Sequence, residues 1–264
     1  MMQAIDFWLV DAFSDRPFGG NAAAVCPLTD WLPDEVMLQM ARQHNQSETA
    51  FLVRNDSGFE LRWFTTHAEI DLCGHATLAA AHVIFEYLDW PETSIRFSTR
   101  FVGELQVTRN GEWLTLDLPA RDCTPVTPPQ ALLQALGIDR ARSVSKGKCW
   151  LVELSSREQV EALQPDFALM RQIGGLNKVC VTAADSEYDF VSRFFSPEVT
   201  MPEDPVTGSA HTMLIPWWGA KLGKTQMRAR QVSQRGGDLR CEWLEDRVKI
   251  GGQARTYIMG KVFL

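Results

Sequence analysis

The polar residues that could do acid–base chemistry lie in two similar segments, half a chain apart. One reads E-I-D-L-C-G-H-A-T (69–77) and the other reads E-D-P-V-T-G-S-A-H (203–211). In each, an acidic turn leads through a glycine, Gly74 or Gly208, into apolar residues typical of a helix. A glycine there lets a ligand approach the backbone, and the unpaired N–H groups of a first helical turn attract anions. The repeat therefore predicts two helix ends that converge on one small anionic ligand between two similar lobes.

The second segment carries the densest group of polar side chains in the chain. Asp204 precedes Pro205, which keeps it extended, while Thr207 is a natural helix cap and Ser209 lies in the first turn. Simple capping by Asp204 and Thr207 is the alternative interpretation. Capping needs one such group, however, and the segment combines acids, a hydroxyl, a glycine and a histidine, so we favour a functional role.

The first segment offers a histidine and a thiol. A lone histidine at a helix start, such as His75, is more often a structural hydrogen-bond donor, but its match to Ser209 favours catalysis. A thiol at a helix N-terminus, such as Cys73, has a lowered pKa and can act as acid or base. Because the matching position is Thr207, a racemase with one thiol on each face of its substrate is disfavoured.

Two further polar residues stand beside apolar strands. Glu48, in S-E-T-A-F-L-V (47–53), begins a strand that becomes apolar at once, and the residues alone do not separate a catalytic base from an exposed carboxylate. Asn21, in G-G-N-A-A-A-V (19–25), ends a Gly-Asn turn before a strand of small residues, where a substrate or a facing helix could approach.

The composition and the motifs argue against several classes of ligand. Neither phosphate-binding glycine pattern is present, so no nucleotide cofactor is expected. No metal is expected either, because His67, Cys73 and His75 lack a fourth ligand at a recognised spacing. The formal charge of −7 and the lack of a basic cluster argue against nucleic acid. We predict six reduced cysteines.

The sequence contains neither a targeting signal nor an apolar run of about 18 residues. We therefore expect no membrane association and take the cytoplasm as the default location.

The pattern of elements predicts an α+β fold with internal pseudo-symmetry. Two helices that are apolar on nearly all sides, at 75–88 and 208–222, are expected to be enclosed by strands, with a kink or break at Pro216. An amphipathic helix is predicted at 32–43. The predicted strands are 4–10, 48–53, 58–65, 94–100, 103–109, 112–118, 149–154, 177–183, 188–195, 225–233, 238–244, 246–251 and 255–263. The proline-rich stretch 118–130 is interpreted as the crossing between the lobes, 1–118 and 119–264.

Together these segments resemble the PhzF family, named for a phenazine-biosynthesis isomerase, which shares its fold with diaminopimelate epimerase. The resemblance covers nearly the whole chain in order. Its most specific stretch is E-D-P-V-T-G-S-A-H (203–211), supported by a late Q-V-S-Q-R-G-G (231–237). Ala22, Thr66 and Thr200 depart from the family's usual Pro, Pro and Gly, which puts the substrate in doubt more than the reaction type.

The resemblance implies two lobes, each a mostly antiparallel, barrel-like sheet around a central helix, with the active site in the cleft between them. It implies a homodimer without a cofactor, and a final strand, near 256–264, that can return to the first lobe. The family's catalytic carboxylate falls on Glu48, and its supporting groups fall on His75, Asp204 and Ser209.

We hypothesise that Glu48 moves a proton within a small carboxylic acid and that the helix ends bind its carboxylate. Gly74, Gly208, Asn21, Thr207 and Cys73 complete the predicted substrate site. Such a shuttle requires a carboxyl whose pKa is raised toward the working pH by burial and by the substrate's charge. The alternatives are an amino-acid racemase or epimerase that uses Cys73, and a metabolite-binding protein without turnover.

Overall fold

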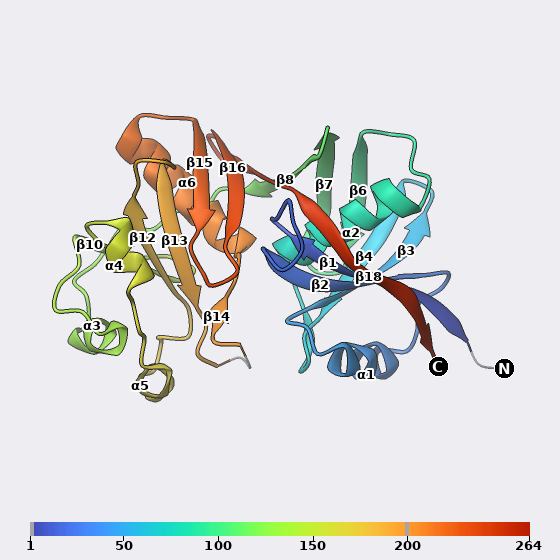
Figure 1. Cartoon of the computed structure of the whole chain (residues 1–264), viewed down its shortest axis with the longest axis horizontal. Coiled ribbons are helices and arrows are strands. Elements are labelled where there is room, and N and C mark those ends of the chain that lie inside the picture. Colours follow the sequence, from blue (N-terminus) through green and yellow to red (C-terminus); the bar gives the residue numbers. More distant parts are fainter. Residues whose placement is uncertain (1–2, 199–200) are drawn as a thin grey trace. The chain divides into compact units, whose positions relative to one another are not determined.

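A computed structural model describes residues 3–198 and 201–264, so Thr200 lies outside the described residues. The chain divides into two compact units (Figure 1). The first consists of the residues up to 117 together with 251–264, and the second consists of residues 118–250. Each unit combines strands with one long, largely buried helix, which confirms the predicted α+β fold.

In the first unit, neighbouring strands pair mostly antiparallel. β1 lies between β18 and β2 and is antiparallel to both, and the pairs β3–β4, β6–β7 and β7–β8 are antiparallel as well. Only β2–β3 and β4–β6 are parallel among the pairs described for this unit. The strands are β1 (Ala4–Ala12), β2 (Asn21–Leu28), β3 (Thr49–Asn55), β4 (Gly58–Phe64), β5 (Glu69–Ile70), β6 (Ser94–Thr99), β7 (Gly103–Asn110), β8 (Trp113–Pro119) and β18 (Ala254–Phe263).

The long helix α2 (Gly74–Tyr87) packs against β1, β2, β3 and β18. Its residues from Gly74 to Ala81 and from Val83 to Phe85 are all buried, because strands cover the helix on several sides. Alanines and a glycine at its start allow this close approach. The smaller helix α1 (Asp34–His44) is amphipathic and buries Met37, Met40 and Ala41.

The second unit repeats the same order of strand pairing. In the first unit, β2–β3 is parallel, β3–β4 and β4–β5 are antiparallel, β4–β6 is parallel and β6–β7 is antiparallel. In the second, β11–β12 is parallel, β12–β13 and β13–β14 are antiparallel, β13–β15 is parallel and β15–β16 is antiparallel. The predicted pseudo-symmetry is therefore confirmed at the level of strand topology.

The second unit's strands are β9 (Thr124–Pro125), β10 (Ser143–Lys146), β11 (Trp150–Glu153), β12 (Val179–Ala184), β13 (Phe190–Phe195), β14 (Glu203–Asp204), β15 (Gln226–Gln231), β16 (Gly237–Leu244) and β17 (Arg247–Gly252). Its helices are α3 (Gln130–Leu136), α4 (Arg157–Glu161), α5 (Phe167–Gln172) and α6 (Gly208–Leu222). Like α2, α6 is mostly buried, and it contacts β15 and β16.

Several predicted elements need correction. A kink or break was predicted at Pro216; α6 runs continuously from Gly208 to Leu222, so the helix is not broken there. The proline-rich stretch, interpreted only as the crossing between the lobes, contains the short strand β9. The helices α3, α4 and α5 and the strand β10 were not predicted. All six cysteines are free thiols. Among the described residues, no helix is long and apolar enough to cross a membrane.

Candidate active site

Glu48 stands at the entrance of β3, and its backbone is fixed by the neighbouring strand. The chain leaves α1 through Asn45, which has a left-handed backbone, and reaches β3 three residues after that turn. The carbonyl of Glu48 accepts a hydrogen bond from the N–H of Ala24 on β2, at 3.3 Å. The parallel pairing of β2 with β3 therefore sets where the Glu48 side chain begins.

The Glu48 carboxylate meets His75 at the start of α2. His75 Nε2 lies 3.2 Å from Glu48 Oε2, and the two side chains are only 6% and 18% exposed. Within the described residues, Glu48 Oε2 makes no hydrogen bond beyond this ion-pair contact. One carboxylate oxygen is therefore held close to an imidazole and still has lone pairs that could take a proton.

Three more polar side chains surround the His75 ring. Asn21 Nδ2 lies 3.1 Å and Cys73 Sγ lies 3.4 Å from Nδ1, while Ser47 Oγ lies 3.4 Å from Nε2. All belong to the first unit and come from β2, from the segment before β3, and from the N-terminus of α2. The sequence-predicted residues Asn21, Glu48, Cys73 and His75 are therefore brought together, and Gly74 lies between the last two along the chain.

The contacts within this cluster shift the pKa values of Glu48 and His75 in opposite directions. Burial raises the pKa of Glu48, but hydrogen bonding and the charge of His75, with help from Ser47 and Cys73, outweigh burial and leave the pKa below its usual value. Burial lowers the pKa of His75, but the contacts with Cys73 and Glu48 hold it well above the usual value. The result is an ionised carboxylate beside a protonated imidazole.

One sequence-based expectation about these pKa values is wrong, and another holds only in part. Burial raises the pKa of Glu48 as expected, but the His75 contact outweighs burial; the expected effect of the substrate's charge stays a prediction. The Cys73 thiol was expected to have a lowered pKa at the helix end, but burial and the nearby Glu48 charge raise it to about 11. Cys73 is therefore a neutral thiol at neutral pH.

Three residues of this cluster carry atoms that can bind a metal, and one such atom from each lies within 4.8 Å of the others: Glu48, Cys73 and His75. The thiol is nearer to Nδ1 of His75 (3.4 Å) than to Nε2 (4.0 Å), whereas the carboxylate contacts Nε2. Nε2 of His75 therefore lies within 4.0 Å of both other ligands, so the three atoms are close enough to share one ion. Three ligands are one fewer than the four of a structural zinc site, and the prediction of no metal stays a prediction.

The corresponding segment of the second unit is held by a glutamine. Thr207 Oγ1 donates to Asp204 Oδ2 at 2.6 Å, and the Thr207 N–H donates to Gln231 Oε1 at 2.9 Å. Gln231 Nε2 in turn donates to the Asp204 carbonyl at 2.6 Å. Thr207 occupies the N-cap position of α6 but makes no side-chain cap bond, so its predicted capping role is wrong. Its hydroxyl orients the Asp204 carboxylate instead.

The two helix starts have one further kind of contact in common, a side chain that donates to the carbonyl four residues before it. Thr77 Oγ1 donates to the Cys73 carbonyl at 2.6 Å, and His211 Nδ1 lies 2.9 Å from the Thr207 carbonyl, so its N–H donates there. Ser209 follows Gly208 in the first turn of α6, and its carbonyl accepts the hydroxyl of Thr212. The structure thus places Asp204, Thr207, Gly208 and Ser209 in one short segment of the second unit.

Gln231 and Ser47 were missed by the sequence reasoning. Gln231 is completely buried at the end of β15 and opens the Q-V-S-Q-R-G-G segment, which was noted only for its resemblance. Ser47 precedes Glu48 in the chain and would have been found by treating the N-Q-S-E turn as one unit.

Comparison with known proteins identifies the family. The model of phenazine biosynthesis-like proteins, PhzC-PhzF, matches residues 10–260. The chain belongs to this family. It is 48% identical over 255 residues to an uncharacterised isomerase of Pseudomonas aeruginosa, covering 97% of each chain. It is also 41% identical over 267 residues to an uncharacterised isomerase of Halalkalibacterium halodurans, covering 100% of each.

A solved structure agrees with the family assignment. The crystal structure of a PhzF-family protein from Enterococcus faecalis has a TM-score of 0.96 and 42% identity, and the match covers 99% of this chain and 100% of that one. A probable proline racemase from Agrobacterium radiobacter, at 10% identity and a TM-score of 0.65, shares the fold. The two relatives in Pseudomonas aeruginosa and Halalkalibacterium halodurans are named isomerases, whereas the racemase match shows a common fold only.

Proposed function

We propose that the protein is an isomerase that moves a proton within a small carboxylic acid, with Glu48 as the base. The observation that carries this proposal is the buried contact of 3.2 Å between Glu48 Oε2 and His75 Nε2. His75 keeps the carboxylate ionised at neutral pH, so the base is ready to accept a proton without a prior activation step. The family membership supports the same reaction class.

In the proposed reaction, Glu48 takes a proton from an acidic carbon of the substrate. The electron pair of the broken C–H bond is delocalised into the adjacent unsaturated or carboxyl group. Glu48 then returns the proton to a different carbon, so the net change is an isomerisation with no gain or loss of atoms. His75 favours the ionised state of Glu48, so Glu48 holds the proton only briefly before it returns it to the substrate. We propose that these side chains suffice without a cofactor.

We also propose roles for the remaining predicted residues. The N–H groups at Gly74 and Gly208 and the Ser209 hydroxyl bind the substrate carboxylate, since helix starts favour anions. Asn21, whose Nδ2 lies 3.1 Å from Nδ1, fixes the His75 ring by turning its amide oxygen to Nδ1, because a protonated Nδ1 can only donate. Asp204, oriented by Thr207, handles protons at the substrate's polar groups.

The pKa of the Cys73 thiol distinguishes this proposal from the alternative of a racemase that uses Cys73 as its base. A thiolate base would need a lowered pKa, whereas the pKa of Cys73 is raised to about 11. We therefore assign Cys73 a supporting contact with His75 rather than proton abstraction. A Cys73→Ala variant that loses activity, together with a Glu48→Gln variant that keeps it, would favour the racemase.

The decisive experiment is incubation with a library of small carboxylic acids in D₂O, read by NMR for deuterium uptake and for shifted double bonds. We expect uptake with the wild type, and a loss of about 10²–10⁴-fold in rate with Glu48→Gln, the usual contribution of a general base. Glu92→Gln changes an exposed carboxylate and is the matched control. Tight binding of an acid without any exchange would mean that the protein binds but does not catalyse.

The family resemblance also leads us to propose a homodimer. Exposed apolar side chains on β18, at Tyr257, Ile258 and Met259, offer a surface that a second copy could cover. Light scattering of the intact protein tests this, and a monomer at all concentrations would contradict it.

A further inference from the structure

Both copies of the internal repeat contain an arginine paired with a glutamate through the same atoms. Arg62 Nε and Nη2 donate to Glu69 Oε1 and Oε2, each at 2.7 Å. Arg193 Nε and Nη2 donate to Glu203 Oε1 and Oε2, at 2.7 and 2.8 Å. This two-bond geometry is the strongest and most directional form of an arginine–carboxylate pair.

Each pair joins the end of a long strand to a short strand that follows it. Arg62 lies on β4 and Glu69 begins β5, while Arg193 lies on β13 and Glu203 begins β14. The register is the same in both units, since Phe64 is opposite Glu69 and Phe195 is opposite Glu203.

The sequences that connect each arginine strand to its glutamate strand differ in length, yet the two Arg–Glu pairs have the same geometry. Four residues separate Phe64 from Glu69, whereas seven separate Phe195 from Glu203. From each glutamate to the glycine that begins the helix the spacing is five positions, 69 to 74 and 203 to 208. The two units therefore share the spacing from the glutamate to the start of the helix. They do not share the length of the connection before the glutamate.

The surroundings make each arginine a rigid support. The Arg62 guanidinium lies over the rings of Trp31 and Phe64, at 5.1 and 5.2 Å from their centres. Arg193 lies 5.0 Å from the ring of Phe195, and its Nη1 donates to the carbonyls of Val160, Glu161 and Leu163 at the end of α4. Both arginine side chains are only 11% exposed.

We propose that these two Arg–Glu pairs are positioning residues for the isomerisation. Each pair fixes the segment that brings the proposed site residues to a helix start: Cys73 and His75 after Glu69, and Asp204, Thr207 and Ser209 after Glu203. The proposal rests on the function assigned above. It explains why the connecting sequence can differ in length between the two copies while the pair and the residues after the glutamate keep the same spacing.

The test replaces each arginine by lysine, which keeps the charge and loses the two-bond geometry. We expect Arg62→Lys and Arg193→Lys to lower kcat by about 10- to 100-fold with KM changed by less than about threefold, since a misplacement of about 1 Å can cost about 10²-fold. The isosteric variants Glu69→Gln and Glu203→Gln serve the same purpose if a lysine variant fails to fold.

Two NMR measurements test the positioning without relying on turnover. In Arg62→Lys, the titration of the His75 ring is expected to move toward that of an ordinary histidine, because its contact with Glu48 loosens. In Arg193→Lys, the Thr207 amide, which donates to Gln231, is expected to exchange with solvent at least tenfold faster. If the wild type shows no turnover, the proposed function fails, while these measurements still decide the positioning.

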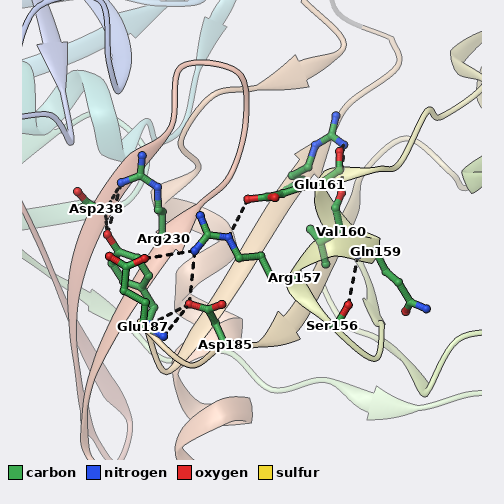
Figure 2. A network of polar contacts seen from close by, with 11 residues as sticks. Ser156, Arg157, Gln159, Val160, Glu161, Asp185, Glu187, Arg230 and Asp238 are labelled. Carbon is green, nitrogen blue, oxygen red and sulfur yellow. Dashed lines mark hydrogen bonds and ion pairs between the residues drawn. The ribbon is translucent and has the colours of Figure 1, made fainter.

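Matched controls come from arginines in other ion pairs of the same units. Arg109 pairs with Glu86 at 3.1 Å and lies over the Phe85 ring, and Arg157 pairs with Glu161 at 2.7 Å. Figure 2 shows Arg157 joined by dashed lines to Glu161, Asp185 and Glu187. We expect Arg109→Lys and Arg157→Lys to leave kcat and both NMR signals unchanged. Lysine variants of Arg62 and Arg193 that lose stability but keep kcat and both signals would overturn the proposal.

Discussion

The Glu48→Gln substitution tests the charge state of the site through stability rather than activity. Glutamine has nearly the same shape as glutamate but cannot carry its charge. The variant therefore removes the ion pair with His75, whose atoms are 3.2 Å apart, and leaves the packing intact. The free energy of unfolding, measured at several pH values, then reports how much the pair contributes.

The directions of the two pKa shifts set the pH window. The pKa of folded Glu48 is lowered, so its contribution is present above the unfolded value of about 4.3 and is lost as the pH falls through the lower folded value. The pKa of folded His75 is raised, so its contribution is complete below about pH 6.5 and is lost as the pH rises through the higher folded value. The stability difference between wild type and variant should therefore peak between about pH 4.3 and 6.5.

The size of the difference follows from burial. Removing one partner of a buried pair costs about 3–5 kcal/mol when the other partner stays charged. His75 can release its proton once the carboxylate is gone, which limits the loss. We expect Glu48→Gln to be about 3 kcal/mol less stable near pH 6, and about 1 kcal/mol or less above the folded pKa of His75.

Urea unfolding at a series of pH values measures this difference, and NMR of the His75 ring confirms its charge in each variant. Glu92→Gln, on an exposed loop residue, is the control and should change stability little at any pH. A loss of stability in Glu48→Gln that does not depend on pH, or that grows as the pH rises above 6.5, would refute the ion pair.

Three other substitutions and one chemical treatment have clear expected results. Gly20→Ala should lower the free energy of unfolding, measured in urea, by about 3 kcal/mol, because φ is +61° and the new Cβ would lie 2.0 Å from a backbone carbonyl oxygen. Gly103→Ala is the comparison: φ is +77° but nothing lies within 4 Å of the new Cβ, so the loss should be about 1 kcal/mol. Gln231→Leu should cost about 1–3 kcal/mol, because the buried Thr207 N–H loses its acceptor; an unchanged unfolding midpoint would contradict this contact. Cys73 should resist alkylation in the folded protein at pH 8, since its pKa is about 11, and peptide mass mapping would detect any modification.

The sequence predicted the enclosed helices and most long strands because their signals are local. The helix predicted at 208–222 has these same bounds, and the strands predicted at 48–53 and 58–65 are the antiparallel pair β3 and β4. The helices α3, α4 and α5 have seven, five and six residues, which is too short for a helical period to stand out from loop.

The site was predictable in its members but not in its electrostatics. Glu48 and His75 belong to different segments, so nothing local reveals that their side chains touch. Burial alone would have raised the pKa of Glu48, and only the contact with His75 reverses that direction. In the same way, the sequence predicted the Thr207 hydroxyl as a helix cap, whereas in the structure it donates to Asp204 Oδ2 at 2.6 Å.

The pairing of β18 with β1 has a consequence for how the molecule is made. The strand that completes the first unit is synthesised after every residue of the second unit. Until it arrives, one edge of β1 stays open, and an open strand edge can pair with other chains. A chain that is cut short before Ala254 would keep that edge exposed, so we expect it to associate with other chains more readily than a chain that carries β18.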